Sequence, residues 1–133
     1  QENPKKVYSI DNGFSTVNTV SFSKDKGRML ENQVFLHLRR KNRDIFYFRE
    51  EQECDFITKN KNKIDQAIQV CFNLNEENQD RELNGLLEAL EKFQLSEGLI
   101  LTFDQEDVFE VKQKKIKVLP VWKWLLDTNS KTF

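Results

Sequence analysis

Four side chains have types and positions that suggest chemistry: a glutamate, an aspartate, a glutamine and a cysteine. Glu31 falls at the margin of the apolar stripe of an expected helix, where it either pairs with Arg28 or solvent, or serves as a metal ligand. Asp55 interrupts an apolar strand, a place that disfavours aspartate, so it marks either a wet strand edge or a site. Gln69 and Cys71 share one face of a further strand, because successive strand residues alternate between faces.

Other kinds of chemistry find little support in the sequence. Cys71 is a candidate nucleophile or soft-metal ligand, but the only histidine, His37, belongs to the first expected helix, so Cys71 is interpreted as a buried packing residue and His37 as a solvated one. Cys54 and Cys71 have no metal-ligand companions or disulfide framework, which favours a reducing cytoplasm. The G-x-x-x-x-G-K-[ST] motif is absent, so this stretch is not expected to bind ATP.

Composition predicts one compact domain. The chain has 133 residues and 38% hydrophobic residues, among them 11 Phe, which are enough to build a core. A formal net charge of -1 excludes the globally basic surface of nonspecific nucleic-acid binders, although residues 39–43, 59–63 and 112–117 are locally basic. No apolar run approaches the roughly 20 residues needed to span a bilayer, so no membrane partner is expected. The chain lacks an initiator methionine and is interpreted as an excised fragment.

Hydrophobic periodicity predicts the order β-α-β-β-β-α-β-β-α. Leu30, Val34 and Leu38 recur at four-residue spacing on the first helix, for which Ser23 or Asp25 is the expected N-cap. The second helix is long enough to return the chain for a parallel strand. Trp122 and Trp124, in the last helix, are expected to serve the core and a docking surface. The expected elements are strands over 7–10, 45–49, 53–57, 67–74 and 99–103, helices over 24–41 and about 81–95, a hairpin or one bent strand over 108–119, and a short helix from 120.

The candidate residues resemble those of one nuclease superfamily. A helix with Glu31, a strand with Asp55 and, 14 residues later (69 minus 55), the run Gln69-Val70-Cys71 are similar to the PD-(D/E)xK nucleases. The resemblance implies a helix glutamate, a strand aspartate and an acid-x-lysine pair that converge on one or two magnesium ions. It also implies a restriction-endonuclease-like three-layer α/β sandwich, with a central mixed sheet flanked by helices.

A second and closer resemblance rests on several separated stretches, which are 7–14, 27–35, 53–56, 68–71, Asp80-Arg81-Glu82 and 120–126. In these stretches the chain resembles the C-terminal domain of unknown function of prokaryotic, archaeal-type AAA ATPases, which are ATP-binding proteins. This resemblance implies a tethered ATPase module as partner, with residues 1–22 as entry strand and linker, 23–128 as the nuclease-like domain and 129–133 as a frayed end.

The sequence departs from the nuclease pattern at two positions. Gln69 stands where the second acid belongs, and Cys71 stands where the lysine belongs, so magnesium binding is weakened and no lysine activates water. Arg81 and Lys63 are the candidate substitute cations, although an arginine stays protonated and makes a poor base.

Three functions follow as expectations. The favoured one is a domain with a degenerate catalytic site that helps the ATPase recognise DNA or protein. The first alternative is an active magnesium-dependent DNA endonuclease, with Glu31, Asp55 and Gln69 as metal ligands. The second alternative is a pure protein-interaction domain, in which the carboxylates are ordinary salt-bridge partners.

Overall fold

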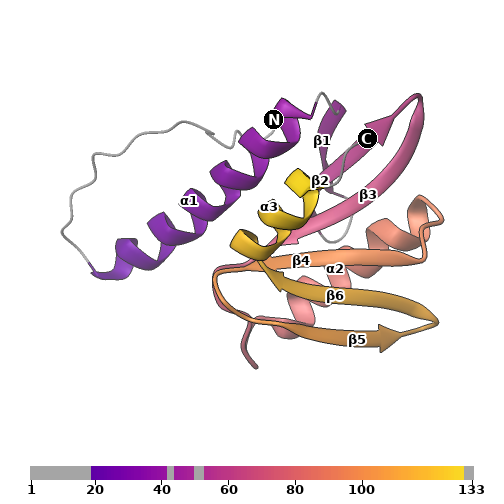
Figure 1. The fold of residues 1–133 in the computed structure, drawn as a ribbon. Helices are drawn as coiled ribbons and strands as arrows, with labels where there is room; N and C mark the ends of the chain where they lie inside the picture. Colours follow the sequence, from indigo (N-terminus) through magenta and orange to yellow (C-terminus); the bar gives the residue numbers. More distant parts are fainter. Residues whose placement is uncertain (1–18, 42–43, 50–52, 131–133) are drawn as a thin grey trace.

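One mixed sheet of six strands organises the part of the chain that the computed structural model describes, residues 19–41, 44–49 and 53–130 (Figure 1). The strand order across the sheet is β1-β2-β3-β4-β6-β5. The elements are α1 (Thr19–Arg40), β1 (Asp44–Arg49), β2 (Glu53–Asn60), β3 (Lys63–Val70), α2 (Gln79–Lys92), β4 (Glu97–Thr102), β5 (Asp107–Val111), β6 (Lys114–Pro120) and α3 (Val121–Ser130).

Short turns and one helical crossover set this topology. Lys61-Asn62 and Lys112-Gln113 all have positive φ angles, the conformation that tight two-residue hairpin turns require, and they join β2 to β3 and β5 to β6 as antiparallel pairs. Helix α2 carries the chain across the sheet, so β4 lies parallel to β3 and also to β6. The predicted parallel return after the second helix is therefore confirmed.

Helices α1 and α3 cover one face of the sheet. The predicted stripe of Leu30, Val34 and Leu38 is buried on this side, which confirms the interpretation of the helix periodicity. The expectation that His37 is solvated is wrong, because α3 covers it: His37 is buried, and its ring centroid is 4.9 Å from that of Trp124. We call the buried residues on this side the α1-face cluster: Leu30, Val34, Leu38, Phe56, Ile68, Leu101, Val121 and Trp124.

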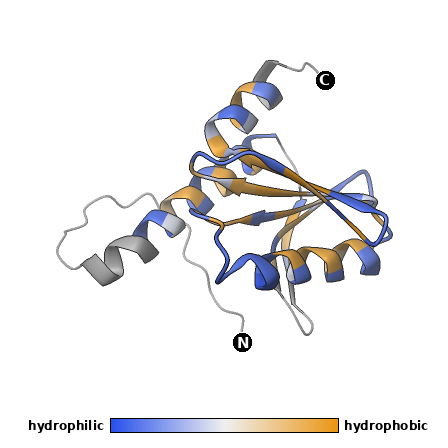
Figure 2. Cartoon of the chain, turned by 90° about the horizontal axis from the view of Figure 1, so that it is seen from below, coloured by the Kyte–Doolittle hydropathy of each residue, from blue (hydrophilic) through white to orange (hydrophobic). Residues whose placement is uncertain are grey.

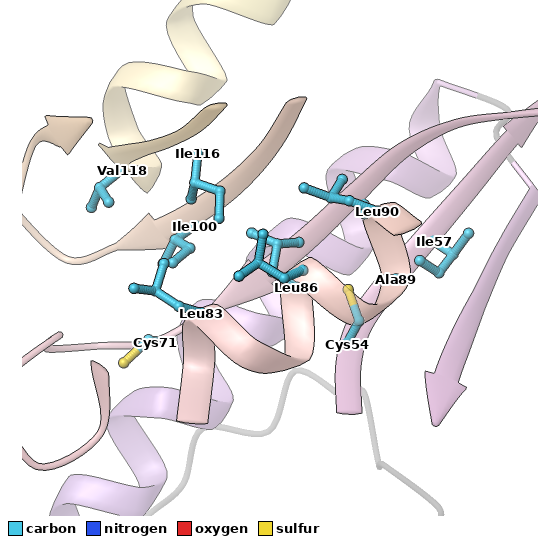
Figure 3. Packing of buried hydrophobic residues seen from close by; sticks show 12 residues of the cluster. Cys54, Ile57, Cys71, Leu83, Leu86, Ala89, Leu90, Ile100, Ile116 and Val118 are labelled. Atoms are coloured by element: carbon cyan, nitrogen blue, oxygen red, sulfur yellow. The ribbon is translucent and has the colours of Figure 1, made fainter. Parts of the chain in front are cut away.

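Helix α2 covers the opposite face (Figure 3). Its apolar side packs on the sheet, and its hydrophilic residues lie on the other side of the helix (Figure 2). The helix approaches the start of β4 closely, because a Cβ built on Gly98 would stand 2.9 Å from Leu86. We call the buried residues here the α2-face cluster: Cys54, Ile57, Ala67, Cys71, Leu83, Leu86, Leu87, Ala89, Leu90, Ile100, Ile116 and Val118.

Several predicted boundaries are wrong for identifiable reasons. Helix α1 begins at Thr19, so Ser23 and Asp25 lie inside it; the four-residue apolar spacing is interrupted at Lys26, so the first turns of the helix were not recognised. Strand β3 covers residues 63–70 instead of 67–74, because the two-residue turn lets its polar first half pair with β2. Helix α2 ends at Lys92, short of residue 95. The last two strands form a hairpin and are not one bent strand.

With helices on both faces of a mixed sheet, the expected α/β layering is observed in the described residues. The predicted strand over residues 7–10 lies outside them. None of the described helices is long and apolar enough to cross a membrane.

Candidate functional site

A β-bulge places Asp55. Between two successive paired positions, β1 advances by two residues while β2 advances by three, so β2 carries one extra residue at Asp55-Phe56. As a result Cys54 and Ile57 both face α2, whereas Phe56 faces α1. Simple alternation, which put Cys54 and Phe56 on one face, is therefore wrong at this point of β2.

Asp55 and Gln69 join the diverging ends of β2 and β3. The Asp55 N–H donates to Gln69 Oε1 at 2.9 Å, and Asp55 Oδ2 accepts from the Val70 N–H at 2.9 Å. The other end of the Gln69 amide, Nε2, donates to the carbonyl oxygen of Glu82 at 3.2 Å in the first turn of α2. Gln69 is 3% exposed, so this amide is a buried clamp that fastens β3 to both β2 and α2.

Cys71 lies directly after β3, on the α2 side. Its N–H donates to the carbonyl of Leu101 at 2.9 Å, and the Asn78 Nδ2 donates to its sulfur at 3.6 Å. Burial raises the pKa of the Cys71 thiol to about 11, and the carboxylate of Glu82 contributes in the same direction. At neutral pH Cys71 is therefore an uncharged, partly hydrogen-bonded side chain in the α2-face cluster.

The two candidate substitute cations lie at different distances from the Asp55 neighbourhood. Arg81 is exposed, pairs with Glu82 at 3.4 Å, and lies close enough to Cys71 for its charge to lower the thiol pKa. Arg81 is therefore near Cys71, and its role as a substitute cation stays a prediction. Lys63 is the first residue of β3, at the opposite end of the strand from Gln69 and about 20 Å away along it. Lys63 is too distant for the substitute role.

Glu31 belongs to the other side of the sheet. It is half-buried on α1, one turn before Phe35, whose ring stacks on Phe56 with centroids 6.5 Å apart. Phe56 is the residue next to Asp55 in the bulge of β2. The helix that carries Glu31 packs on Phe56 and therefore covers the bulge. Asp55, Gln69, Cys71 and Arg81 thus belong to one neighbourhood at the ends of β2 and β3, while Glu31 is placed across the sheet from α2.

The described donor set does not fit a magnesium site as it stands. Within the described ranges no three His, Cys, Asp or Glu side chains gather closely enough to hold a metal ion. Gln69 Oε1 and Asp55 Oδ2 each accept a backbone hydrogen bond. Hard divalent ions prefer several carboxylate or carbonyl oxygens that converge on one point.

Sequence reasoning missed two residues of this neighbourhood, Glu82 and Asn78. The Glu82 side chain is only 14% exposed, and its charge raises the pKa of Cys71. Asn78 bonds Cys71 and the carbonyl of Asn73, which fixes the loop that leads into α2. The available signal was weak: an acid immediately before buried Leu83 is common in the first turn of any helix.

Two comparisons with known proteins bear on this chain. A family model described as "Domain of unknown function (DUF4143)" matches residues 26–124. The chain is also similar to "Uncharacterized protein MJ1544" of Methanocaldococcus jannaschii, at 39% identity over 132 residues. That match covers 91% of this chain but only 29% of the relative, so the chain spans less than a third of the relative's length.

Proposed function

Since the chain belongs to the family described as Domain of unknown function (DUF4143), we propose that it is a nuclease-like recognition domain with a degenerate catalytic site, tethered to an ATPase. One observation carries this proposal. The Gln69 amide stands at the position of a nuclease acid, and both of its ends are bonded to backbone, at Asp55 and at Glu82. A side chain used in this way holds strands and helix together and does not serve a metal.

The neutral thiol of Cys71 supports the same conclusion. A phosphodiester under attack gains negative charge, which a lysine at this position neutralises and an uncharged thiol does not. The nearby Arg81 supplies a cation, but it is exposed and paired with Glu82, and a guanidinium does not deprotonate water.

The relative supports the tether. A stretch similar to this chain makes up only 29% of that longer protein, so most of the relative consists of other segments. From the resemblance to domains of ATPases, we propose that those other segments include the ATPase. This domain would then recognise what the ATPase acts on.

The test restores the nuclease residues. We would compare the unmodified chain, Gln69→Glu/Cys71→Lys and the same double variant with Asp55→Ala, titrating magnesium and manganese by calorimetry and assaying labelled single- and double-stranded DNA. The unmodified chain is expected to bind neither metal at millimolar concentration and to leave DNA intact. The double variant is expected to bind metal, because it adds a carboxylate beside Asp55, and Asp55→Ala is expected to abolish that binding.

Gln69→Glu alone shows whether the fold tolerates the first exchange, because it keeps Oε1 for the Asp55 N–H but replaces the Nε2 donor by a carboxylate oxygen that faces the carbonyl oxygen of Glu82. Thermal unfolding reports whether each variant folds. Metal binding and DNA cleavage by the unmodified chain, both lost with Asp55→Ala, would establish the alternative of an active magnesium-dependent endonuclease. A folded double variant that binds no metal would refute a nuclease-derived site.

A further inference from the structure

Exposed aromatic side chains gather at the carboxyl ends of β4 and β6. Phe103 directly follows β4 and is 52% exposed; Trp122, in the first turn of α3, is 56% exposed. The two strands end at the same level, because Thr102 is paired with Pro120. Figure 1 shows the end of β4 and the start of α3 at the same side of the molecule.

Specific contacts hold these aromatics in place. The Phe103 ring stacks on Phe72 with centroids 4.8 Å apart, and the Phe103 N–H donates to the carbonyl of Phe72 at 3.1 Å. The first turn of α3 is joined to the connection between β4 and β5 by a salt bridge of 2.8 Å between Lys123 and Glu106. The rings are therefore presented on a fixed base, which lowers the entropy cost of binding.

The exposed apolar area continues along α3. Leu126 is 62% exposed and lies one turn after Trp122, on the side away from buried Val121 and Trp124. We call Phe103, Trp122 and Leu126 the aromatic surface. Together they expose roughly 350 Å², about the size of the largest apolar patch on a monomer, which is often functional.

The charge beside the aromatic surface is negative. Residues 103–107 and 121–127 contain four carboxylates, Asp104, Glu106, Asp107 and Asp127, and one ammonium group, Lys123. A second ammonium group, that of Lys26 in α1, stands 5.3 Å from the centroid of the Phe72 ring, so the carboxylates still outnumber these cations. A nucleic acid would be repelled by this arrangement, and so would a second copy of the same surface. A partner that carries basic groups around apolar side chains would be attracted.

We propose that the aromatic surface docks a basic protein segment with an apolar face, such as an amphipathic helix flanked by lysine or arginine. Apolar side chains of that segment pack on Phe103, Trp122 and Leu126, and its basic groups lie against the acidic residues of the β4–β5 connection. This inference goes beyond the proposed function, because it names the class of partner and the place where it binds. It does not depend on the state of the Asp55 neighbourhood.

The probe is a short amphipathic helical peptide of leucine and lysine, with a leucine–glutamate peptide of the same pattern and a DNA duplex as comparisons. Calorimetry measures binding to the unmodified chain and to two variants. Phe103→Ser/Trp122→Ser is expected to weaken binding of the lysine peptide by about tenfold or more, as for central aromatic anchors. Asp104→Asn/Asp107→Asn is expected to weaken it severalfold and to reduce its dependence on salt.

Phe46→Ser is the matched control. Phe46 is 40% exposed on β1, at the opposite edge of the sheet, so its replacement should leave binding unchanged. Thermal unfolding identifies the variants that remain folded. The proposal is overturned if the lysine peptide fails to bind at millimolar concentration, if the control weakens binding as much as the double variant does, or if the glutamate peptide or DNA binds this surface equally well.

Discussion

At the scale of single residues, Gln69 and Cys71 both take part in packing at the ends of β2 and β3. Gln69 accepts a hydrogen bond from the Asp55 N–H and donates one to the carbonyl of Glu82, and Cys71 joins the α2-face cluster as a neutral thiol. Both residues stabilise the ends of β2 and β3. The carboxylates of Asp55 and Glu82 remain, and both raise the pKa of Cys71.

The pKa of Cys71 gives a prediction for stability at alkaline pH. The folded state holds the thiol proton with a pKa of about 11, against an ordinary value of 9.0, so the thiol stabilises the fold below pH 9 and this contribution is lost as the pH rises toward 11. Two pKa units correspond to about 2 to 3 kcal/mol. We therefore expect the free energy of unfolding of the unmodified chain to fall relative to Cys71→Ala by about this amount between pH 8 and pH 11.

Urea unfolding at stepped pH, under reducing conditions, measures this difference. All other ionisable groups are the same in both proteins, so the comparison isolates Cys71. The loss of packing in Cys71→Ala is independent of pH and shifts the whole curve without bending it. A difference that stays constant across this range would contradict the raised pKa.

The sequence indicated which residues to consider as a site, but it did not predict the contacts that they make. Strand alternation places Gln69 and Cys71 on one face, which the bond from Gln69 to α2 and the place of Cys71 in the α2-face cluster confirm. It also places Ile68 and Val70 on the opposite face, where both belong to the packing around α1. The bulge at Asp55 could not be predicted, because it depends on the register with β1 and leaves no periodic signal. Because the bulge was not predicted, the two hydrogen bonds of the Gln69 amide could not be predicted either.

At the scale of elements, the fold depends on how closely α2 approaches the sheet. The periodicity of α2 and the parallel return of β4 were predictable from apolar spacing, whereas the helix–sheet distance was not. That distance is set where Gly98 lacks a side chain and Leu86 occupies the space. The start of α1 was also missed, because Lys26 interrupts the four-residue apolar spacing that marks the rest of the helix.

Gly98→Ala is expected to destabilise the fold by about 1 to 3 kcal/mol, as overpacking does. The added methyl group would stand 2.9 Å from both Cγ and Cδ2 of Leu86, so relief requires a shift of the side chain at its branch point and of α2. Denaturant unfolding monitored by circular dichroism measures the change. Leu86→Val in the same background should recover part of the loss.

Gly27→Ala is the matched control. Gly27 lies within α1, and a Cβ built there has nothing within 4 Å, so the same substitution should stabilise the helix by about 0.5 to 1 kcal/mol. Opposite signs at the two glycines are expected from packing. Equal effects would show that α2 does not constrain Gly98.

At the scale of the whole molecule, the two buried clusters share one sheet. Neighbouring residues point to opposite sides on each central strand, as Phe56 and Ile57 do on β2 and as Leu101 and Ile100 do on β4. If either cluster lost its packing, water would reach one face of the same strands whose other face packs in the second cluster. A domain built in this way is expected to unfold in one cooperative transition.

Leu90→Ala tests this coupling from one side of the sheet to the other. Leu90 is fully buried in the α2-face cluster, so the cavity should cost about 2 to 5 kcal/mol. In a Trp122→Phe background, the fluorescence of buried Trp124 reports on the α1-face cluster alone. We expect its denaturation midpoint to fall together with that of the circular dichroism signal, because both clusters unfold with the shared sheet.

Leu126→Ala is the control, because it removes the same atoms from a side chain that is 62% exposed and should cost less than about 0.5 kcal/mol. If Trp124 kept its midpoint while Leu90→Ala lowered that of the circular dichroism signal, the two faces would be independent units, and the sheet would not transmit the loss of packing.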